Sequence, residues 1–385
     1  MSYFQPDTID YLYSQVDNPF SETVSLCHHC HKHVPALRYF NDSKVYMAKY
    51  CTEHGVMHHL IESDSEFYNN LNCTYDPNLR PGFYNGVMLT EVTDRCNLDC
   101  PHCYHIPNNA LTDINKEIVL NNLKLCKEKL SGLETITLAG AEATIRRDFP
   151  ELISDITNLG LDCSVISNGI KLADEKFLKK CLDAGLKDFS VGLNHPSYNN
   201  IPKARKKQEI ALDNSLEYGL KIGYISYTMA SLTELDDILK EIIDTNWNPA
   251  IFRIRYGSDI GTNPGQERLF LSDLYKEFSK WCKLNGKNFE IIEPCDNNIY
   301  HIMVNLEGRK IRLIQWCDET DIDMEELKTG PWCDFVYDGI TNFLHQIIRR
   351  DVYKNQKIAL PDTPPLRYHY RYMPCTEPLD LRNLK

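Results

Sequence analysis

The chain has 385 residues, of which 42% are hydrophobic and 25% charged, an ordinary globular composition that allows one large domain or two. No apolar run approaches the roughly 18 residues of a membrane-spanning helix. The N-terminal stretch has no basic region followed by an apolar core, so we expect no secretory signal. The net charge of −12 argues against nucleic acid as the main partner.

The 15 cysteines are many for a chain of this length. Without a secretory signal we expect a cytoplasmic, reducing location, where clustered cysteines are typical of metal sites rather than disulfides. Three scattered cysteines, Cys126, Cys163 and Cys181, fall at apolar positions of helix or strand patterns. We expect those three to be buried in the core, because a free cysteine behaves as a small hydrophobe.

Residues 1–80 show no long periodic segment but carry two Cys/His pairs, Cys27-His-His-Cys30 and Cys51-Thr-Glu-His54. Two such pairs predict a tetrahedral site for zinc, or for a rubredoxin-like iron. The fourth ligand is either His54, which fits the pair spacing, or Cys73, which would give four thiolates. We therefore predict a small zinc-ribbon or rubredoxin-like module, in which a closed metal site stabilises a core too small to fold alone.

Residues 81–270 alternate short β-rich runs with helical patterns, which predicts βαβ units and a parallel sheet. The predicted strands are Val87–Glu91, Thr135–Leu138, Asp162–Ile166, Phe189–Leu193, Ile222–Tyr227 and Ile251–Arg255. The predicted helices are Asn115–Leu130, Asp148–Thr157, Asp174–Ala184, Lys206–Tyr218 and Leu232–Thr245.

Residues 271–385 break this rhythm and are predicted to form an α+β extension. We expect a helix over Leu271–Leu284, a strand over Phe289–Ile292 and a second helix over Asp338–Arg350. The runs His301–Leu306 and Lys310–Gln315 alternate around a Glu-Gly pair, which predicts a hairpin.

Three cysteines follow the first predicted strand of the alternating region, in the stretch DRCNLDCPHCYH. Cys96, Cys100 and Cys103 have the Cys-x3-Cys-x2-Cys spacing, and Tyr104 follows directly. Three thiolates can hold three corners of a [4Fe–4S] cube, and a cluster held only by cysteine needs four. One iron would therefore lack a protein ligand and would be free to bind a substrate.

This motif resembles that of the radical S-adenosylmethionine (SAM) enzymes, and the six strand–helix units match the partial (β/α)6 TIM-like barrel of that family. The resemblance implies that the open iron chelates the amino and carboxylate groups of SAM. An electron from the cluster would then cleave the sulfur–C5′ bond, and the 5′-deoxyadenosyl radical would take hydrogen from a substrate. The Cys/His module before the barrel, with the stretches Cys-x2-Cys-His-Lys-x-Val-Pro-Ala and Cys-x2-His-Gly, resembles the branch that contains tetraether lipid synthases and pterin-methylating enzymes.

The resemblance also implies positions for SAM contacts at the carboxyl ends of the strands, where α/β barrels gather their reacting groups. Ala139-Gly-Ala-Glu142 occupies the place of a Gly-Gly-Glu-Pro segment and departs from it at Ala139 and Ala143. Gly140 and Glu142 remain, for the methionine part of SAM. The other contacts that the resemblance implies are the backbone of Tyr104 with adenine, Ser167 and Asn168 with ribose, and Asn194 where the family often has Asp. Arg253 is suited to the SAM carboxylate and Arg255 is its neighbour on the same face, with a surface ion pair as the alternative for either.

Two residues near the predicted strand ends, His195 and Tyr227, are candidate catalytic groups, although a loop histidine is more often without function. Cys295, Cys317 and Cys333, with Cys375, are candidate ligands of an auxiliary [4Fe–4S] cluster. Buried single thiols are the alternative, since the compact cysteine pairs of the family's usual extensions are not visible.

The leading hypothesis is a radical SAM enzyme that acts on a small molecule, by methylation or by carbon–carbon bond formation. It implies an electron donor such as flavodoxin or ferredoxin. One alternative is a radical SAM enzyme that modifies a peptide. Another is an iron–sulfur and zinc protein that binds or transfers electrons without cleaving SAM.

Overall fold

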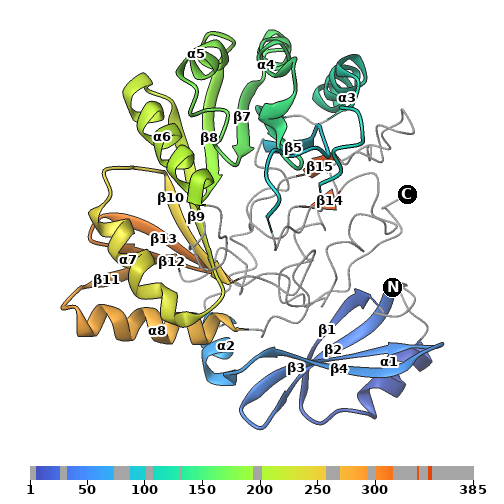
Figure 1. Cartoon of the computed structure of the whole chain (residues 1–385). Coiled ribbons are helices and arrows are strands. Elements are labelled where there is room, and N and C mark those ends of the chain that lie inside the picture. The colour runs from blue at the N-terminus through green and yellow to red at the C-terminus, as the bar shows by residue number, and fades with distance from the viewer. Residues whose placement is uncertain are drawn as a thin grey trace.

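The protein is seen here as a computed structural model that describes residues 6–26, 33–72, 87–100, 107–129, 132–193, 202–256, 269–293, 301–314, 336–337 and 346–348. Within these ranges the chain forms one four-stranded sheet and one eleven-stranded sheet (Figure 1). None of the described helices is long and apolar enough to cross a membrane.

The N-terminal sheet is an antiparallel meander in the order β1-β2-β3-β4. Its strands are β1 (Pro19–Leu26), β2 (His33–Asn41), β3 (Lys44–Cys51) and β4 (Gly55–Glu62), flanked by helices α1 (Pro6–Tyr13) and α2 (Ser65–Asn72). Leu12 of α1 packs on one face, and Tyr68 joins the core cluster on the other. The sequence of this region shows no long periodic segment, although it forms four strands of eight or nine residues. Apolar residues lie on both faces, so the strands do not alternate cleanly in sequence.

The larger sheet contains six parallel strands in sequence order. These are β5 (Val87–Glu91), β6 (Thr135–Ala139), β7 (Asp162–Ser167), β8 (Leu186–Gly192), β9 (Lys221–Met229) and β10 (Ile251–Tyr256). The connecting helices are α3 (Lys116–Lys129), α4 (Phe149–Asn158), α5 (Glu175–Asp183), α6 (Pro202–Tyr218) and α7 (Leu235–Asp244), with short 3-10 turns η2 (Ala143–Ile145) and η3 (Leu232–Glu234).

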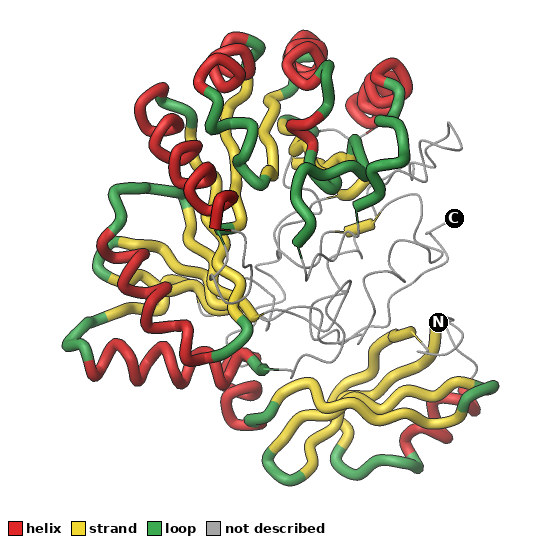
Figure 2. The backbone as a smooth tube through the Cα atoms, viewed as in Figure 1, coloured by secondary structure: helices red, strands yellow, loops and turns green. Residues whose placement is uncertain are grey.

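Helices α3 to α7 lie outside the curved sheet, as Figure 2 shows. The main core lies between them and the strands. Cys126, Cys163 and Cys181 are fully buried in this core, as predicted. The parallel α/β architecture of a partial barrel is therefore confirmed, with each predicted strand and helix of this region present.

The region after residue 270 extends the same sheet. Helix α8 (Leu271–Leu284) is followed by β11 (Phe289–Glu293), β12 (His301–Leu306) and β13 (Arg309–Ile314). The predicted hairpin is confirmed, with Glu307 and Gly308 both at positive φ in its turn. Strand β13 also pairs in parallel with β10, so the hairpin continues the barrel wall.

On the opposite edge, β15 (Gln346–Ile348) pairs in parallel with β5 and antiparallel with β14 (Val336–Tyr337). The prediction of a helix over Asp338–Arg350 was therefore wrong for the described residues. Ile347 and Ile348 are β-branched, and pairing them with β5 satisfies backbone groups on a strand that would otherwise be an edge.

The N-terminal module contacts the barrel through the start of α8. The hydroxyl of Ser272 donates to the Glu62 carboxylate at the end of β4, and Lys276 forms an ion pair with Asp64 at 2.6 Å. Glu62 is 4% exposed, and burial raises the pKa of its carboxyl despite these hydrogen bonds. The module is thus held against the barrel by polar contacts with one helix terminus.

Candidate active site at the carboxyl edge of the parallel sheet

The first two cysteines of the motif lie in the loop after β5. The thiols of Cys96 and Cys100 are partly exposed and form no disulfide. The backbone N–H of Leu98 donates to the Cys96 sulfur at 3.3 Å, and the Asn109 side chain accepts from the Cys96 N–H at 3.0 Å. Cys103 and Tyr104 lie outside the described residues.

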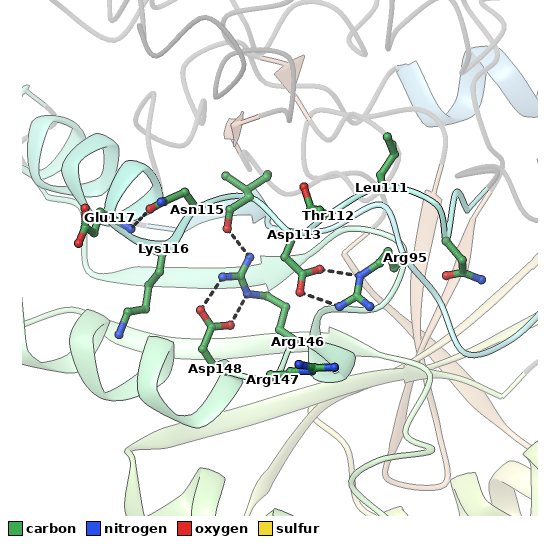
Figure 3. Close-up of a pocket in the computed structure, with 12 residues that line it drawn as sticks. Arg95, Leu111, Thr112, Asp113, Asn115, Lys116, Glu117, Arg146, Arg147 and Asp148 are labelled. Carbon is green, nitrogen blue, oxygen red and sulfur yellow. Dashed lines mark hydrogen bonds and ion pairs between the residues drawn. The ribbon is translucent and has the colours of Figure 1, made fainter.

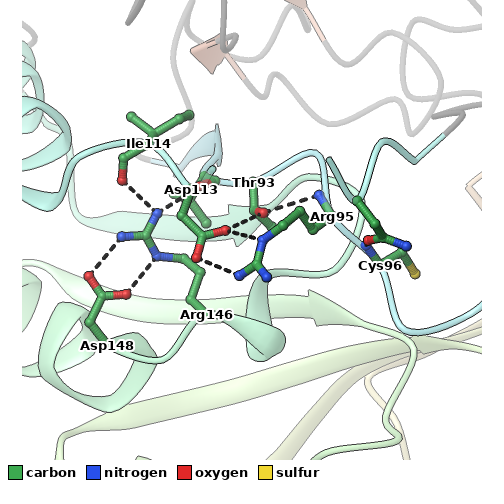
Figure 4. Close-up of polar contacts among 9 residues, drawn as sticks. Thr93, Arg95, Cys96, Asp113, Ile114, Arg146 and Asp148 are labelled. Atoms are coloured by element: carbon green, nitrogen blue, oxygen red, sulfur yellow. Dashed lines mark hydrogen bonds and ion pairs between the residues drawn. The ribbon is translucent and has the colours of Figure 1, made fainter. Parts of the chain in front are cut away.

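A polar network braces the start of this loop (Figure 4). Asp113 accepts from Thr93 at 2.7 Å and from both Nε and Nη2 of Arg95 at 2.9 and 2.6 Å. Burial alone would raise the pKa of the Asp113 carboxyl, but the hydrogen bonds from Arg95 and Thr93 hold it below its usual value. The carboxylate is therefore charged at neutral pH, and it fixes the residue that precedes Cys96.

Arg146 adds a second brace from the turn before α4. It is 3% exposed and donates to the backbone carbonyls of Val92 and Ile114, both at 2.8 Å, while Asp148 accepts from its Nε and Nη2. Sequence reasoning missed Arg95, Asp113 and Arg146. The run Thr93-Asp-Arg95 directly before the first cysteine was the available signal.

These arginines line a pocket of about 620 Å³, drawn in Figure 3. The pocket lies beside the loop after β5 and the start of α3, and its wall combines basic and acidic side chains. Arg95 and Arg146 already pair with Asp113 and Asp148. We therefore assign this pocket a structural role and no ligand.

The loop after β6 packs directly on the cysteine loop. The N–H groups of Ala141 and Glu142 donate to the carbonyls of Thr93 and Arg95, both at 3.0 Å. Gly140 has φ of +120°, and a Cβ at this position would lie 2.3 Å from the Thr93 carbonyl oxygen. Only glycine allows the two loops to approach this closely.

The carboxylate of Glu142 joins this loop to the one after β7. It is 1% exposed and accepts from the Asn168 N–H at 2.6 Å, the Ser167 hydroxyl at 2.8 Å, and the N–H and hydroxyl of Thr144. Burial raises the pKa of this carboxyl, and the four donated hydrogen bonds oppose that rise. In this arrangement the Glu142 carboxylate holds the Ser167–Gly169 turn and is not displayed to solvent.

The turn after β7 contacts the cysteine loop through the side chain of Asn168. Nδ2 of Asn168 donates to Oδ1 of Asn97 at 2.8 Å and lies 3.7 Å from the Cys96 sulfur, within hydrogen-bond range for sulfur. Ser167 is 4% exposed, and its hydroxyl both donates to Glu142 and accepts from the Gly169 N–H. Cys96, Gly140, Glu142, Ser167 and Asn168 thus meet at one edge of the sheet, as predicted from their positions after the strands.

Tyr227 does not meet these residues. It is 1% exposed on the helix side of β9, and its hydroxyl donates to Glu241 of α7 at 2.9 Å. This position does not fit the predicted catalytic role, and we do not propose that role for it. His195, and Asn194 beside it, lie outside the described residues.

Arg253 and Arg255 share the other face of the sheet, on β10. The guanidinium carbon of Arg253 lies 3.5 Å from the centroid of the Tyr224 ring. Nε of Arg255 donates to the Thr228 hydroxyl at 2.8 Å. Arg255 is the nearer of the two to the carboxyl end of the strand, and so to the loops that carry Cys96 and Asn168.

In the N-terminal module, Cys51 and His54 lie at the β3–β4 turn, with 3.4 Å between the thiol sulfur and Nδ1. Zn–S and Zn–N bonds in a tetrahedral site would separate these atoms by about 3.5 Å, so the pair fits a shared zinc ion. Strand β1 ends at Leu26 and β2 begins at His33, and these two residues are paired. Val34, the next residue of β2, is buried with Cys51.

The remaining predicted ligands lie outside the described residues. Those of the N-terminal module are Cys27, Cys30 and Cys73, and those of the auxiliary cluster are Cys295, Cys317 and Cys333. No group of three or more metal-ligating side chains occurs within the described ranges.

Two family models match the chain, one on each sheet. Residues 90–245 match the radical SAM superfamily, a range that contains the cysteine motif and the loops with Gly140 and Asn168. Residues 90–245 are therefore a radical SAM superfamily domain. Residues 19–63 match the HMPTM N-terminal zinc ribbon domain, which includes Cys27, Cys30, Cys51 and His54 but not Cys73. Radical SAM membership implies a [4Fe–4S] cluster and SAM, and the ribbon suggests zinc.

Curated relatives are similar to part of this chain. A 7,8-dihydro-6-hydroxymethylpterin dimethyltransferase of Methanocaldococcus jannaschii is 29% identical over 232 residues, which are 54% of this chain and 46% of the relative. A probable GTP 3′,8-cyclase of Methanococcus aeolicus is 34% identical over 169 residues, 40% of this chain and 54% of the relative. The chain thus spans about half the length of these relatives.

Among solved structures, SuiB of Streptococcus suis bound to S-adenosylmethionine aligns with a TM-score of 0.43 and 12% identity. The alignment covers 65% of this chain and 69% of that one.

Proposed function

We propose that this radical SAM protein is an enzyme that cleaves SAM reductively and takes hydrogen from a small-molecule substrate, for methylation or carbon–carbon bond formation. The observation that carries the proposal is the joining of three loops at the carboxyl edge of the sheet. Glu142 and Asn168 connect the loops after β6 and β7 to the loop that holds Cys96 and Cys100. An electron carrier that does not bind SAM would have no need of this assembly.

The donor set fits a [4Fe–4S] cluster, because Cys96 and Cys100 present partly exposed thiols that form no disulfide, and Cys103 follows in the motif. We propose that these three cysteines hold the cluster. When bound, it would supply the electron that breaks the sulfur–C5′ bond of SAM.

We assign the polar residues of the edge two kinds of role. Glu142 and Ser167 are positioning residues, because their polar atoms are buried and bonded to one another. Asn168 is the residue of the turn after β7 whose side chain contacts the cysteine loop. Gly140 keeps the backbone of the β6 loop close to that loop, and Arg255, oriented by Thr228, is suited to the SAM carboxylate.

For the reaction itself we propose methylation, or the joining of two carbons, at a carbon of a small molecule. The support is the HMPTM-type ribbon together with a relative whose name describes a pterin dimethyltransferase. In the ribbon we propose a zinc ion held by Cys27, Cys30, Cys51 and His54. Such a site is closed and would stabilise the module without taking part in chemistry.

The test is anaerobic reconstitution with iron and sulfide, followed by reduction with dithionite in the presence of SAM. The proposal expects release of 5′-deoxyadenosine by the wild type and loss of that release in Cys100→Ala. The Cys126→Ala variant, altered only in the helix-side core, serves as the control for a lost thiol and is expected to keep the release. Product formation by Cys100→Ala at the wild-type level would refute the mechanism.

A further inference from the structure

The inner face of the barrel wall carries neighbouring polar side chains on three strands. Ser226 of β9 is the register partner of Arg253 on β10, and Arg253 is in turn the partner of Arg312 on β13. Residues directly paired across a sheet project to the same face. We call Ser226, Arg253 and Arg312 the inner arginine face.

The opposite face of the same strands is apolar and covered by helices. It is formed by alternate residues of the main core, namely Ile225, Tyr227, Phe252, Ile254, Ile311 and Leu313. The inner arginine face therefore points away from α6, α7 and α8, toward the interior of the barrel. In α/β barrels the active site lies at the carboxyl ends of the strands, and Arg253 and Arg312 lie three and two residues before the ends of theirs.

Both guanidinium groups are removed from bulk water. Arg253 is 4% exposed and Arg312 is 3% exposed. The Tyr224 ring, 3.5 Å from the guanidinium carbon of Arg253, orients that group by a cation–π contact. Both guanidinium groups make contacts within the chain, and an anion bound between them on the inner face would add charge-assisted hydrogen bonds to those contacts.

The hydroxyl of Ser226 supplies a second, independent observation. It is 3% exposed and, within the part of the chain that is described, has no hydrogen-bond partner. Leaving a buried hydroxyl without a partner costs about 1–3 kcal/mol. A ligand oxygen on the inner face, next to Arg253, would remove this cost.

We propose that the inner arginine face binds an anionic oxygen group of the substrate, a carboxylate or a phosphate. The guanidinium groups of Arg312 and Arg253 would donate charge-assisted hydrogen bonds to its oxygens, and the Ser226 hydroxyl would donate a further one. This inference rests on the proposed function and narrows its substrate to an anion.

The position separates this site from the loops assigned to SAM. Arg253 is the third of six residues in β10, and Arg312 the fourth of six in β13, whereas Cys96, Gly140 and Asn168 lie at or beyond the ends of their strands. Both arginines also lie beyond residues 90–245, the range matched by the family model. The two arginines, unlike Ser226, would therefore give this chain a specificity that the shared domain does not define.

The experiment titrates the cluster-reconstituted full chain, saturated with SAM, with inorganic pyrophosphate in one arm and succinate in the other. Binding is measured by calorimetry. We expect one of the two anions to bind saturably to the wild type, with one site per chain. The same anion should bind at least tenfold more weakly to Arg312→Gln. The matched control is Lys310→Gln, which removes an exposed cation from the same strand and should bind the anion as the wild type does. Which arm binds identifies the anion as a phosphate or a carboxylate.

A second variant guards against misfolding. Ser226→Ala removes only the hydroxyl, so its melting temperature should lie within a few degrees of that of the wild type. Its affinity for the anion should nevertheless be several-fold lower. Two results would overturn the inference: no saturable binding of either anion, or equal binding by wild type and Arg312→Gln. A third is the loss of SAM affinity in a folded Arg312→Gln, which would place the arginine in the nucleotide site. Failure of the wild type to release 5′-deoxyadenosine would instead contradict the proposed function, whatever the anion titration shows.

Discussion

The side-chain amide nitrogen of Asn168 lies 3.7 Å from the sulfur of Cys96, across two loops that follow β7 and β5. Hydrogen bonds to cluster sulfurs are one of the means by which a protein sets the potential of an iron–sulfur centre. If Cys96 is a cluster ligand, Asn168 is a positioning residue that also tunes the cluster.

We predict that Asn168→Ala moves the midpoint potential of the cluster to a more negative value, because an N–H donor that stabilises the reduced, more negative cluster is lost. Redox titration followed by EPR measures the shift. The Asn97→Ala variant removes the neighbouring amide contact but retains the Asn168 N–H near sulfur, and should shift the potential less. Equal shifts in the two variants would show that loop geometry alone is responsible.

Gly140→Ala should disrupt the cysteine loop. The new Cβ would meet the Thr93 carbonyl at 2.3 Å, and the positive φ adds strain of about 1–2 kcal/mol. We expect a lower melting temperature and a severalfold loss of iron bound per chain on reconstitution. Gly286 also has a positive φ, of +62°, but no atom lies within 4 Å of a Cβ at this position, so Gly286→Ala should be mildly destabilised and keep its full iron content. Normal iron content in Gly140→Ala would show that the close approach is not required.

Asp188 of β8 should make stability depend on pH. Burial is the largest cause that raises its pKa, from 3.8 to about 6, and Asp162 raises it further while Lys221 opposes. The folded state therefore binds the proton more tightly than the unfolded state. This contribution is fully present below about pH 4 and is lost as the pH rises through about 6.

Asp188→Asn should remove this dependence and stabilise the protein at pH 7.5, by at most about 3 kcal/mol for a shift of two units. Urea denaturation at pH 5 and pH 7.5 measures it. A variant whose stability changes with pH as the wild type's does would contradict the assignment.

His54→Ala should remove zinc from the N-terminal module, since its Nδ1 and the Cys51 thiol are placed for one ion. The zinc content measured by elemental analysis is expected to fall from one ion per chain to much less than one, and the melting temperature is expected to be lower. His58 provides the control: it lies on the other face of the sheet, bonded to Tyr39 at 2.9 Å, and His58→Ala should keep its zinc. Full zinc in the His54 variant would favour Cys73 as the fourth ligand.

Tyr227→Phe should cost stability and leave SAM cleavage unchanged. The buried hydroxyl donates to Glu241, which also pairs with Arg205, so its loss is expected to cost about 1–2 kcal/mol. Denaturation and 5′-deoxyadenosine release are measured on the same preparation. A loss of release without a loss of stability would restore Tyr227 as a catalytic candidate.

Sequence patterns predicted the barrel well because each of its elements repeats a local signal. Apolar residues at helical spacing, such as Val119, Leu123 and Cys126, are all buried against the sheet. The cysteine spacing and the residues after β6 and β7 were likewise readable, because the carboxyl ends of parallel strands share one edge.

The predictions that failed depended on which face of the sheet a side chain lies on, or on partners far away in the sequence. The apolar residues Ile225, Tyr227 and Met229 alternate with Ser226 and Thr228, a signal that could have assigned Tyr227 to the helix side. Strand β15 was not predictable, because its pairing with β5 joins residues more than 250 positions apart. The contacts of Arg146 with Val92 and Ile114 are similarly non-local.

The most direct test of the account is the EPR spectrum of the reconstituted, dithionite-reduced protein, recorded with and without SAM. The account predicts a [4Fe–4S]⁺ signal that changes shape when SAM is added, because the iron left without a cysteine ligand would bind it. A protein that assembles no such cluster, or a signal that SAM leaves unaltered, would contradict it.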